Sequence, residues 1–211
     1  MIKICFRKTI VALAPGLAVA ALLAQAPEPA AATAAGRAAP SAVTAAVLGS
    51  GWRDSHDQAV AVAGDATGLH VLAATAAGGY AWHTVATLGA EGADTAQWIG
   101  QACLTGGGKR AVVVYAPREI TNSPAALGYG ALAAVVDLAT GRVTQLRTGV
   151  SISYFDPGCG VGQDAVLTQG GTGVSPLPGP VTTRLMLLDT VTGKITATAT
   201  VPGQVLSLIH I

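Results

Sequence analysis

Charged and aromatic side chains are scarce in this sequence. Asp, Glu, Lys and Arg make up 11% of the 211 residues and Phe, Trp and Tyr only 4%, whereas 51% are hydrophobic. From residue 27 onward nine Lys and Arg stand against eleven Asp and Glu, a net charge of −2. A chain without a basic excess offers no surface for nucleic acid or an anionic membrane, and one this apolar is not intrinsically disordered. We therefore expect a globular or exported protein.

The sequence also lacks the short motifs of common enzyme classes. It contains no G-x-S-x-G of a serine hydrolase and no H-E-x-x-H of a zinc peptidase. Gly106–Lys109 resembles the end of a phosphate-binding loop, but Cys103 stands where that loop needs its first glycine and Arg110 where it needs Ser or Thr. Residues 158–162 are glycine-rich but lack the spacing of a dinucleotide fingerprint. We predict no catalytic, cofactor-binding or metal-binding residue.

The densest polar group is Asp54-Ser55-His56-Asp57, which has the residue types of a Ser/His/Asp nucleophile set. Adjacent residues on an extended segment point to alternating faces, so we expect a solvated loop or the start of the first strand instead. His70 and His83 lie in expected strands without metal-ligand spacing. We interpret them as core or strand-face histidines.

Residues 1–26 have the pattern of a secretory signal. Three cations precede a fifteen-residue apolar run, and Ala24-Gln25-Ala26 then provides a cleavage site. A transmembrane anchor is the alternative, but it needs about 20 apolar residues, and Pro15 interrupts this run. We predict a secreted or cell-surface protein with no membrane contact after signal cleavage. Residues 27–50, rich in Ala and Pro, are predicted to form a disordered linker.

A nine-residue pattern occurs twice, at residues 135–143 and 187–195. Each copy has two apolar residues, Asp, two spacers, Thr-Gly, a cation and a β-branched residue, and the copies lie 52 residues apart. The pattern predicts a hairpin in which glycine adopts a positive φ while Asp and Thr bond to the backbone of the turn. The predicted turn residues are Asp137, Thr140, Gly141, Asp189, Thr192 and Gly193. Metal binding by the two Asp residues is the alternative, although turn formation already explains both.

A repeat of about 50 residues carried by strands is typical of a β-propeller. We predict an all-β fold, a partial β-propeller of about three four-stranded blades over residues 51–206. Long loops at 118–128 and 170–180 follow the same strand of the second and third units, so we expect them on one face, available for binding. The three blades are placed at residues 51–92, 93–149 and 150–203.

Three blades are fewer than the four to eight of a typical propeller. Leu206–Ile211 resembles a translated sequencing adapter, and the third unit ends where a further blade would begin. We therefore expect a truncated chain, with residues 207–211 as an artefact and the remaining blades in a longer protein. Assembly with copies of the same chain is the alternative.

Cys103 and Cys159 are the two cysteines that follow the signal segment. They precede corresponding strands of successive units and lie 56 residues apart. An even pair in an exported protein predicts a disulfide between neighbouring blades. Two buried free thiols, or a redox or metal role, remain the alternatives.

The two D-x-x-T-G-[KR]-[VI] turns and the strand at 111–118 resemble the N-terminal region of large exported bacterial proteins that begin with a WD40-like or quinoprotein-like β-propeller. The resemblance covers residues 51–203 and implies architecture, not activity. A pyrroloquinoline quinoprotein would imply a Trp-docking motif in each blade. No Trp follows Gly141 or Gly193, and WD dipeptides are absent, so we expect no cofactor.

The sequence favours a non-catalytic recognition or scaffolding module whose partner, a protein or a carbohydrate, binds at the loop face. The alternative is part of a secreted propeller hydrolase, lyase or quinoprotein whose catalytic residues lie beyond the C-terminus of this chain. A propeller attached to a downstream peptidase or cell-wall domain would make the segment purely structural. Five aromatic residues are candidates either for carbohydrate stacking or for packing between blades: Trp82, Trp98, Tyr115, Tyr129 and Tyr154.

Overall fold

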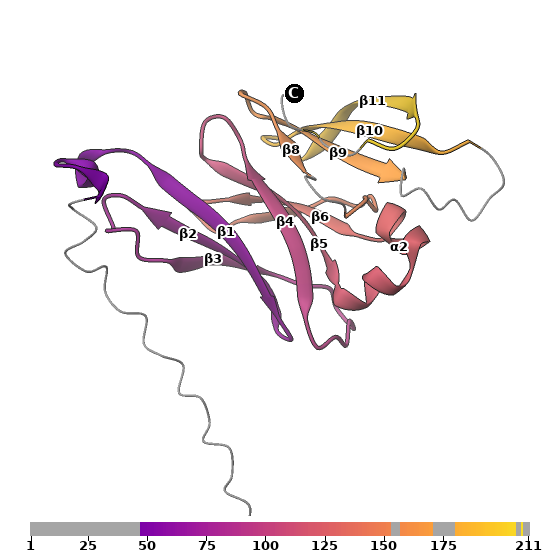
Figure 1. The fold of residues 1–211 in the computed structure, drawn as a ribbon, viewed down its shortest axis with the longest axis horizontal. Helices are drawn as coiled ribbons and strands as arrows, with labels where there is room; N and C mark the ends of the chain where they lie inside the picture. The colour runs from indigo at the N-terminus through magenta and orange to yellow at the C-terminus, as the bar shows by residue number, and fades with distance from the viewer. Residues whose placement is uncertain (1–46, 153–156, 171–179, 206–207, 209–211) are drawn as a thin grey trace, which may run out of the picture. The chain divides into compact units, whose positions relative to one another are not determined.

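Three antiparallel β-sheets, each with its strands in chain order, make up the described part of the computed structural model (Figure 1). The structure describes residues 47–152, 157–170, 180–205 and 208. The chain divides into two compact units, Met1–Ala38 and Ala39–Ile211, and all described residues belong to the second. The predicted signal segment and most of the predicted linker therefore lie outside the described residues. Within the described ranges, no helix is long and apolar enough to cross a membrane.

The first sheet has three strands and the other two have four each. The first consists of β1 (Gln58–Asp65), β2 (Gly68–Thr75) and β3 (His83–Leu88). The second consists of β4 (Trp98–Leu104), β5 (Arg110–Pro117), β6 (Leu132–Asp137) and β7 (Val143–Gln145). The third consists of β8 (Gly158–Cys159), β9 (Asp164–Gly170), β10 (Thr182–Asp189) and β11 (Lys194–Pro202). Short helices are η1 (Trp52–Asp54), η2 (Arg118–Asn122) and α2 (Pro124–Tyr129).

The second sheet is covered on both faces, and this explains the uninterrupted apolar sequence of β5. Val112 and Val114 pack into a cluster with Leu167 of the third sheet. The alternate residues Val113 and Tyr115 pack into another cluster, together with side chains of the first sheet. Because successive side chains of a strand point to opposite faces, a strand between two sheets needs apolar residues at every position.

The first and third sheets each have one face packed on the second sheet. In the first sheet Val60 and Val62 point toward the second sheet, which leaves the alternate alanines of β1 on the outward face. In the third sheet Met186 and Leu188 point inward, and Leu187 faces outward. Sheets stacked face to face in chain order form an all-β partial β-propeller with three blade-like sheets, which confirms the predicted fold class.

The three-stranded sheet matches the last three strands of the other two sheets. The turns after the next-to-last strand of each sheet carry Gly79, Gly141 and Gly193, with φ of 68°, 71° and 69°. In addition, β1 and β4 run in opposite directions. Gly64, near the end of β1, lies against the start of β4, and Gln58, at the start of β1, donates a hydrogen bond to the carbonyl of Gly108, which follows the end of β4. Within the described residues the first blade therefore has no counterpart of β4, and only two sheets show the four strands that were predicted.

Candidate functional site

The connections between strands gather at two ends of the sheets, and the two ends differ in construction. The corner end is defined by the turns β2–β3, β4–β5, β6–β7, β8–β9 and β10–β11. The loop end is defined by the connections β1–β2, β3–β4, β5–β6 and β9–β10. Both ends contain candidate residues from the sequence.

At the corner end, the two repeated turns have the same hydrogen bonds. Thr140 donates to Oδ1 of Asp137 from its backbone N at 3.0 Å and from Oγ1 at 2.8 Å. Thr192 does the same for Asp189, with its backbone N 3.2 Å from Oδ1 and its Oγ1 2.8 Å from Oδ2. The threonine hydroxyl, followed by the threonine backbone N–H, lowers the pKa of each Asp because it stabilises the carboxylate. These carboxylates build turns, and no group of three possible metal ligands occurs among the described residues.

The glycines of these turns lie against neighbouring strands, so their conformation and their small size both matter. A Cβ added to Gly141 would lie 2.7 Å from the backbone O of Val85 in the first sheet. A Cβ on Gly193 would lie 2.7 Å from Cγ2 of Thr144 in the second sheet. Each repeated turn therefore rests on the sheet that precedes it in the chain.

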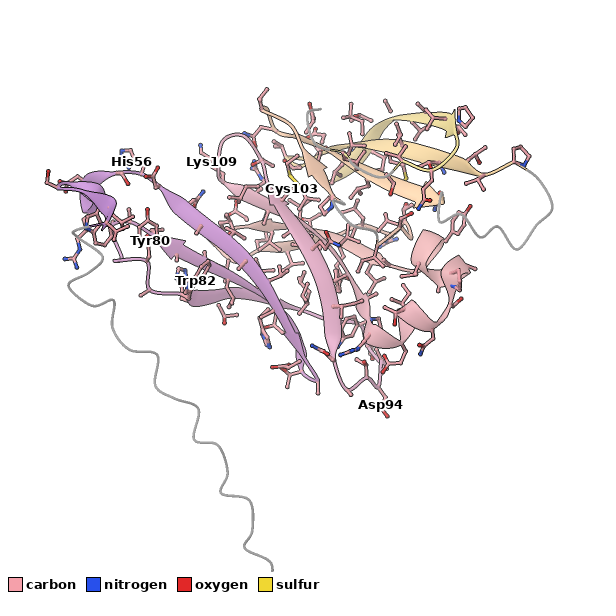
Figure 2. The ribbon with its side chains drawn as sticks, viewed as in Figure 1. His56, Tyr80, Trp82, Asp94, Cys103 and Lys109 are labelled. Carbon is pink, nitrogen blue, oxygen red and sulfur yellow. A yellow bond between two sulfur atoms is a disulfide. The ribbon has the colours of Figure 1, made fainter. Side chains whose placement is uncertain are left out.

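The predicted disulfide is present, and it joins the second and third sheets. Cys103 on β4 is bonded to Cys159 on β8, with their Cα atoms 5.6 Å apart (Figure 2). β4 and β8 are the first strands of their sheets and lie at matching places in the two blades. The bond therefore links blade to blade, as the matching positions of the two cysteines predicted.

The glycine-rich turn after β4 takes part in the same contact between sheets. The backbone N of Gly106 donates to the carbonyl of Gly162 at 2.9 Å, and a Cβ on Gly106 would overlap the backbone of Val161. Arg110 donates from Nη1 to Oε1 of Gln163 at 3.0 Å. Close approach of two backbones accounts for Gly106, which the sequence motif alone could not show.

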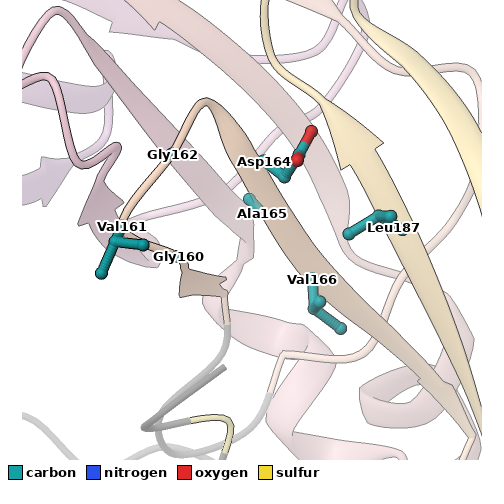
Figure 3. Close-up of a pocket in the computed structure, with 7 residues that line it drawn as sticks. All are labelled: Gly160, Val161, Gly162, Asp164, Ala165, Val166 and Leu187. Atoms are coloured by element: carbon teal, nitrogen blue, oxygen red, sulfur yellow. The ribbon is translucent and has the colours of Figure 1, made fainter.

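A cavity of about 220 Å³ lies on the outward face of the third sheet, at the corner end (Figure 3). Val166 and Leu187 are register partners on β9 and β10 and form its apolar part. Asp164 contributes the one ionisable side chain of the lining. The lining residues are Gly160, Val161, Gly162, Asp164, Ala165, Val166 and Leu187.

At the loop end, the segment after β5 is folded into η2 and α2. Ser123 caps α2 because its Oγ accepts a hydrogen bond from the backbone N of Ala126 at 3.3 Å, and Pro124 occupies the first turn. Oγ1 of Thr95 donates to Oε2 of Glu119 at 2.7 Å, and this bond is the main cause of the lowered pKa of Glu119. The segment is thus held to the β3–β4 connection.

Tyr129 ends this segment with a largely exposed ring. The residue is 53% exposed, and a Cβ built on Gly170 would lie 2.9 Å from its hydroxyl oxygen. Oγ of the buried Ser151 lies 3.0 Å from the carbonyl oxygens of both Gly128 and Gly170. The first predicted contact loop, 118–128, is therefore joined to the start of the second, whose residues 171–179 lie outside the described residues.

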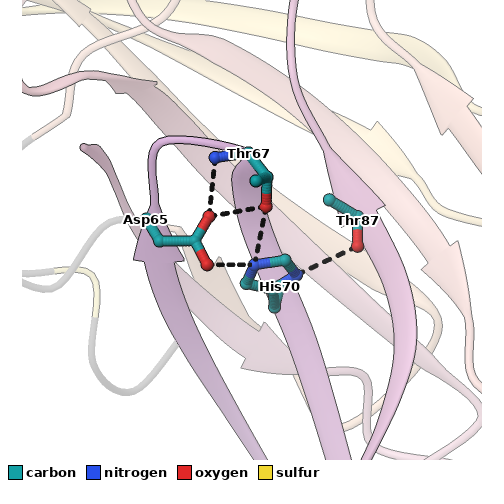
Figure 4. A network of polar contacts seen from close by, with 4 residues as sticks. All are labelled: Asp65, Thr67, His70 and Thr87. Carbon is teal, nitrogen blue, oxygen red and sulfur yellow. Dashed lines mark hydrogen bonds and ion pairs between the residues drawn. The ribbon is translucent and has the colours of Figure 1, made fainter. Parts of the chain in front are cut away.

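A polar network ties the β1–β2 turn to β3, also at the loop end (Figure 4). His70 places Nε2 3.0 Å from Oδ2 of Asp65 and Nδ1 3.0 Å from Oγ1 of Thr87. The pKa of Asp65 falls from 3.8 to about 2, first because the hydroxyl of Thr67 donates to it and then because the Thr67 backbone N–H does. His70 is thus a strand-face histidine, as interpreted from the sequence.

The candidate nucleophile set does not converge. Within Asp54–Asp57, Oγ of Ser55 donates to Oδ2 of Asp57 at 3.0 Å, whereas His56 is exposed and makes no hydrogen bond with either of these side chains. The structure therefore favours the solvated loop.

Among the aromatic candidates, Trp98 and Tyr115 are buried, with ring centroids 5.8 Å apart, and belong to the core. Tyr154 lies outside the described residues.

The sequence analysis missed a second aromatic pair. Trp52 and Tyr80 stack with centroids 5.5 Å apart and an interplanar angle of 9°, and the guanidinium of Arg53 lies 5.1 Å from the Trp52 ring. Tyr80 has φ 56°, and no other described non-glycine residue has a positive φ. The stack holds η1 against the β2–β3 turn and so closes the first sheet at the corner end.

The sequence matches no protein-family profile and no curated protein. Among solved structures it is similar to the crystal structure of the tricorn protease, with a TM-score of 0.40 and 12% sequence identity. That similarity covers 65% of this chain and 11% of the length of the other.

Proposed function

We propose that this chain is a non-catalytic recognition module of a secreted or cell-surface protein and that it binds a carbohydrate at its loop end. The observation that supports the proposal is the exposed ring of Tyr129 at the end of a segment held by specific hydrogen bonds. An aromatic ring presents a flat apolar face at little cost in conformational entropy.

The composition of the loop favours a carbohydrate over a charged partner. The exposed polar side chains at the end of η2 and before α2 are those of Thr121, Asn122 and Ser123, which are neutral and carry hydroxyl or amide groups. Such groups both donate and accept hydrogen bonds, as sugar hydroxyls require. The charged side chains of the segment are already paired, since Arg118 donates from Nη1 to Gln97 Oε1 at 2.7 Å and Glu119 accepts from Thr95.

The Cys103–Cys159 disulfide supports the proposed location, because disulfides persist in oxidising compartments.

Scaffolding is the second part of the proposal. The middle sheet shows that a blade of this protein packs on both faces, and a further sheet of the same kind would cover the outward face of the first sheet.

Affinity electrophoresis in native gels that contain soluble polysaccharides tests the proposal. We would use laminarin, xylan, dextran and glycol chitin, and compare the wild type with Tyr129→Ala. Val191→Ala is the matched control, because Val191 is 54% exposed at the corner end. Retardation by one polysaccharide that Tyr129→Ala abolishes and Val191→Ala preserves is the expected result.

Two outcomes contradict the proposal. The first is equal mobility of all variants with every polysaccharide, which would direct the search to a protein partner. The second is release of reducing ends from a polysaccharide by the purified chain, which would support the enzyme alternative.

A further inference from the structure

We propose that the cavity on the outward face of the third sheet binds a small organic cation, a primary ammonium group attached to an apolar body. This site lies at the corner end and does not depend on the proposed carbohydrate site at the loop end.

The size and lining of the cavity suit an apolar body about as large as a benzene ring with a short arm. Its volume is about 220 Å³, and it is open to solvent, since Val161 in its lining is 97% exposed. Val166 and Leu187 supply apolar side chains on the outward face, and they lie directly opposite each other on adjacent strands. Pockets for small molecules commonly combine such an apolar lining with very few polar groups that fix orientation.

Asp164 supplies the charge that selects an ammonium group. Figure 3 shows its carboxylate at the end of β9 that is nearest the turn. Its side chain forms no ion pair or hydrogen bond with another described residue, whereas the carboxylate of its register partner Asp189 is occupied by Val191 and Thr192. A charge-assisted hydrogen bond from an ammonium donor to Asp164 would complete the site.

The nearby cations do not take this role. Arg110 points its Nη1 at Gln163, and its charge acts on Asp137 and Asp189. Lys194 is the register partner of Asp189 on β11 and makes no ion pair within the described part of the chain. Asp164 is thus the group of the lining that is left for a cationic ligand.

The disulfide holds one wall of the cavity in place. Cys159 directly precedes Gly160, and β8, which contains Cys159, is only two residues long. Within the β8–β9 turn, the carbonyl of Gly162 accepts a hydrogen bond from Gly106 N, and Gln163 accepts hydrogen bonds from Arg110 and Thr190. Because the disulfide is the covalent link directly before Gly160, we infer that the Gly160–Gly162 wall keeps its position only when Cys103 and Cys159 are bonded.

The test is a titration of the full chain with 2-phenylethylamine, followed by isothermal calorimetry or NMR shifts. The neutral analogue 2-phenylethanol and the anion 3-phenylpropionate serve as ligand controls. We expect the amine to bind and both analogues to bind at least about tenfold more weakly, because a hydrogen bond to a charged group accounts for a difference of that size. Asp164→Asn should weaken amine binding by about the same factor.

Further variants separate this proposal from the carbohydrate site and from unfolding. Tyr129→Ala and Val191→Ala should bind the amine as the wild type does. The Cys103→Ser/Cys159→Ser double variant should lose amine binding while its circular dichroism still shows a folded β protein below its melting temperature. If that double variant unfolds, partial reduction of the wild type with the fold monitored in parallel provides the same comparison.

Three results would overturn the proposal: no heat or shift with the amine, equal binding of 2-phenylethanol, or full amine affinity in Asp164→Asn. Full amine affinity in a folded, reduced chain would refute the inference that the disulfide holds the wall of the cavity in place. Carbohydrate binding at the loop end would not change these conclusions, because the two proposed sites are separate.

Discussion

The corner end and the loop end of this protein are built by different rules. At the corner end the same turn occurs twice, with Asp and Thr bonded in the same way and a glycine resting on the preceding sheet. At the loop end the connections differ from one another, from the short turn between Asp65 and Gly68 to the η2–α2 segment. A turn that recurs indicates a structural requirement that the blades share. Connections that differ from one another indicate positions where that requirement does not apply.

The difference lies in what each end holds together. The corner end links the second and third sheets covalently through the disulfide, and also through the Gly106–Gly162 and Arg110–Gln163 hydrogen bonds. The loop end has a polar link through Ser151 as well, but it also presents an exposed aromatic side chain on a fixed backbone. Substitutions in the corner-end links should therefore reduce stability, and substitution of the exposed loop-end aromatic should reduce binding.

Removal of the disulfide should have the largest effect. In the loop-entropy account, a cross-link between residues 56 positions apart stabilises the folded state by up to about 4 kcal/mol. We expect Cys103→Ser/Cys159→Ser to lower the free energy of unfolding by about 2–4 kcal/mol in urea denaturation. The wild type measured with reductant is the control and should show a similar loss. Unchanged stability in both would mean that the corner end does not depend on this link.

Alanine at Gly141 should have the next largest effect. Its φ of 71° is unfavourable for a residue with a Cβ, and that Cβ would lie 2.7 Å from the fixed carbonyl of Val85. We expect Gly141→Ala to lower the unfolding free energy by about 2 kcal/mol, measured by urea denaturation. At Gly193 the contact is a threonine methyl group that can move, so the loss should be smaller.

Gly162→Ala is the matched control for the glycine variants. This glycine lies in another corner-end turn, its φ is outside the left-handed region, and a Cβ there would meet nothing within 4 Å. Its stability should stay within about 0.5 kcal/mol of the wild type. A loss as large as that of Gly141→Ala would show that the turn tolerates no side chain for some reason other than φ or contact.

Acid should weaken the corner end through Asp137 and Asp189. Their pKa values are lowered in the folded state, so their contribution is present above the unfolded value near 3.8 and is lost as the pH falls through the folded value. Asp137→Asn should therefore flatten the decrease of melting temperature below pH 4. Asp164→Asn, which removes a carboxylate outside the repeated turns, should leave the slope unchanged. Equal slopes in all three proteins would contradict the assigned turn role.

The fold was predictable because its signals are local and repeated. Successive blades are equivalent, and this equivalence explains both the 52-residue offset between Asp137 and Asp189 and the matching places of Cys103 and Cys159. The matching places in turn predicted the disulfide. The helix α2 was missed: residues 118–128 were predicted as a loop, although Ser123-Pro124 carries the N-cap and first-turn signals.

The cavity was not predictable, because β9 gives no sign of which face is outward. Ala165, Val166 and Leu167 are all apolar, and only the packing of Leu167 toward the second sheet assigns Val166 to the opposite face. The role of Gly106 was hidden for a related reason, since it depends on the backbone of Val161 in another sheet. Long-range contacts of this kind leave no pattern in a single sequence.

The smallest effect on stability, and the sharpest division between the two ends, is expected at Tyr129. Tyr129 is 53% exposed, so Tyr129→Ala should change the unfolding free energy by no more than about 0.5 kcal/mol in urea denaturation. Tyr129→Phe keeps the ring and removes the hydroxyl that approaches Gly170. If the ring makes the contact, Tyr129→Phe should keep the affinity for a polysaccharide that Tyr129→Ala loses, because stacking requires only the aromatic face. A loss of stability comparable with that of Gly141→Ala would instead place Tyr129 among the residues that hold the sheets together, and the distinction between a structural end and a binding end would fail.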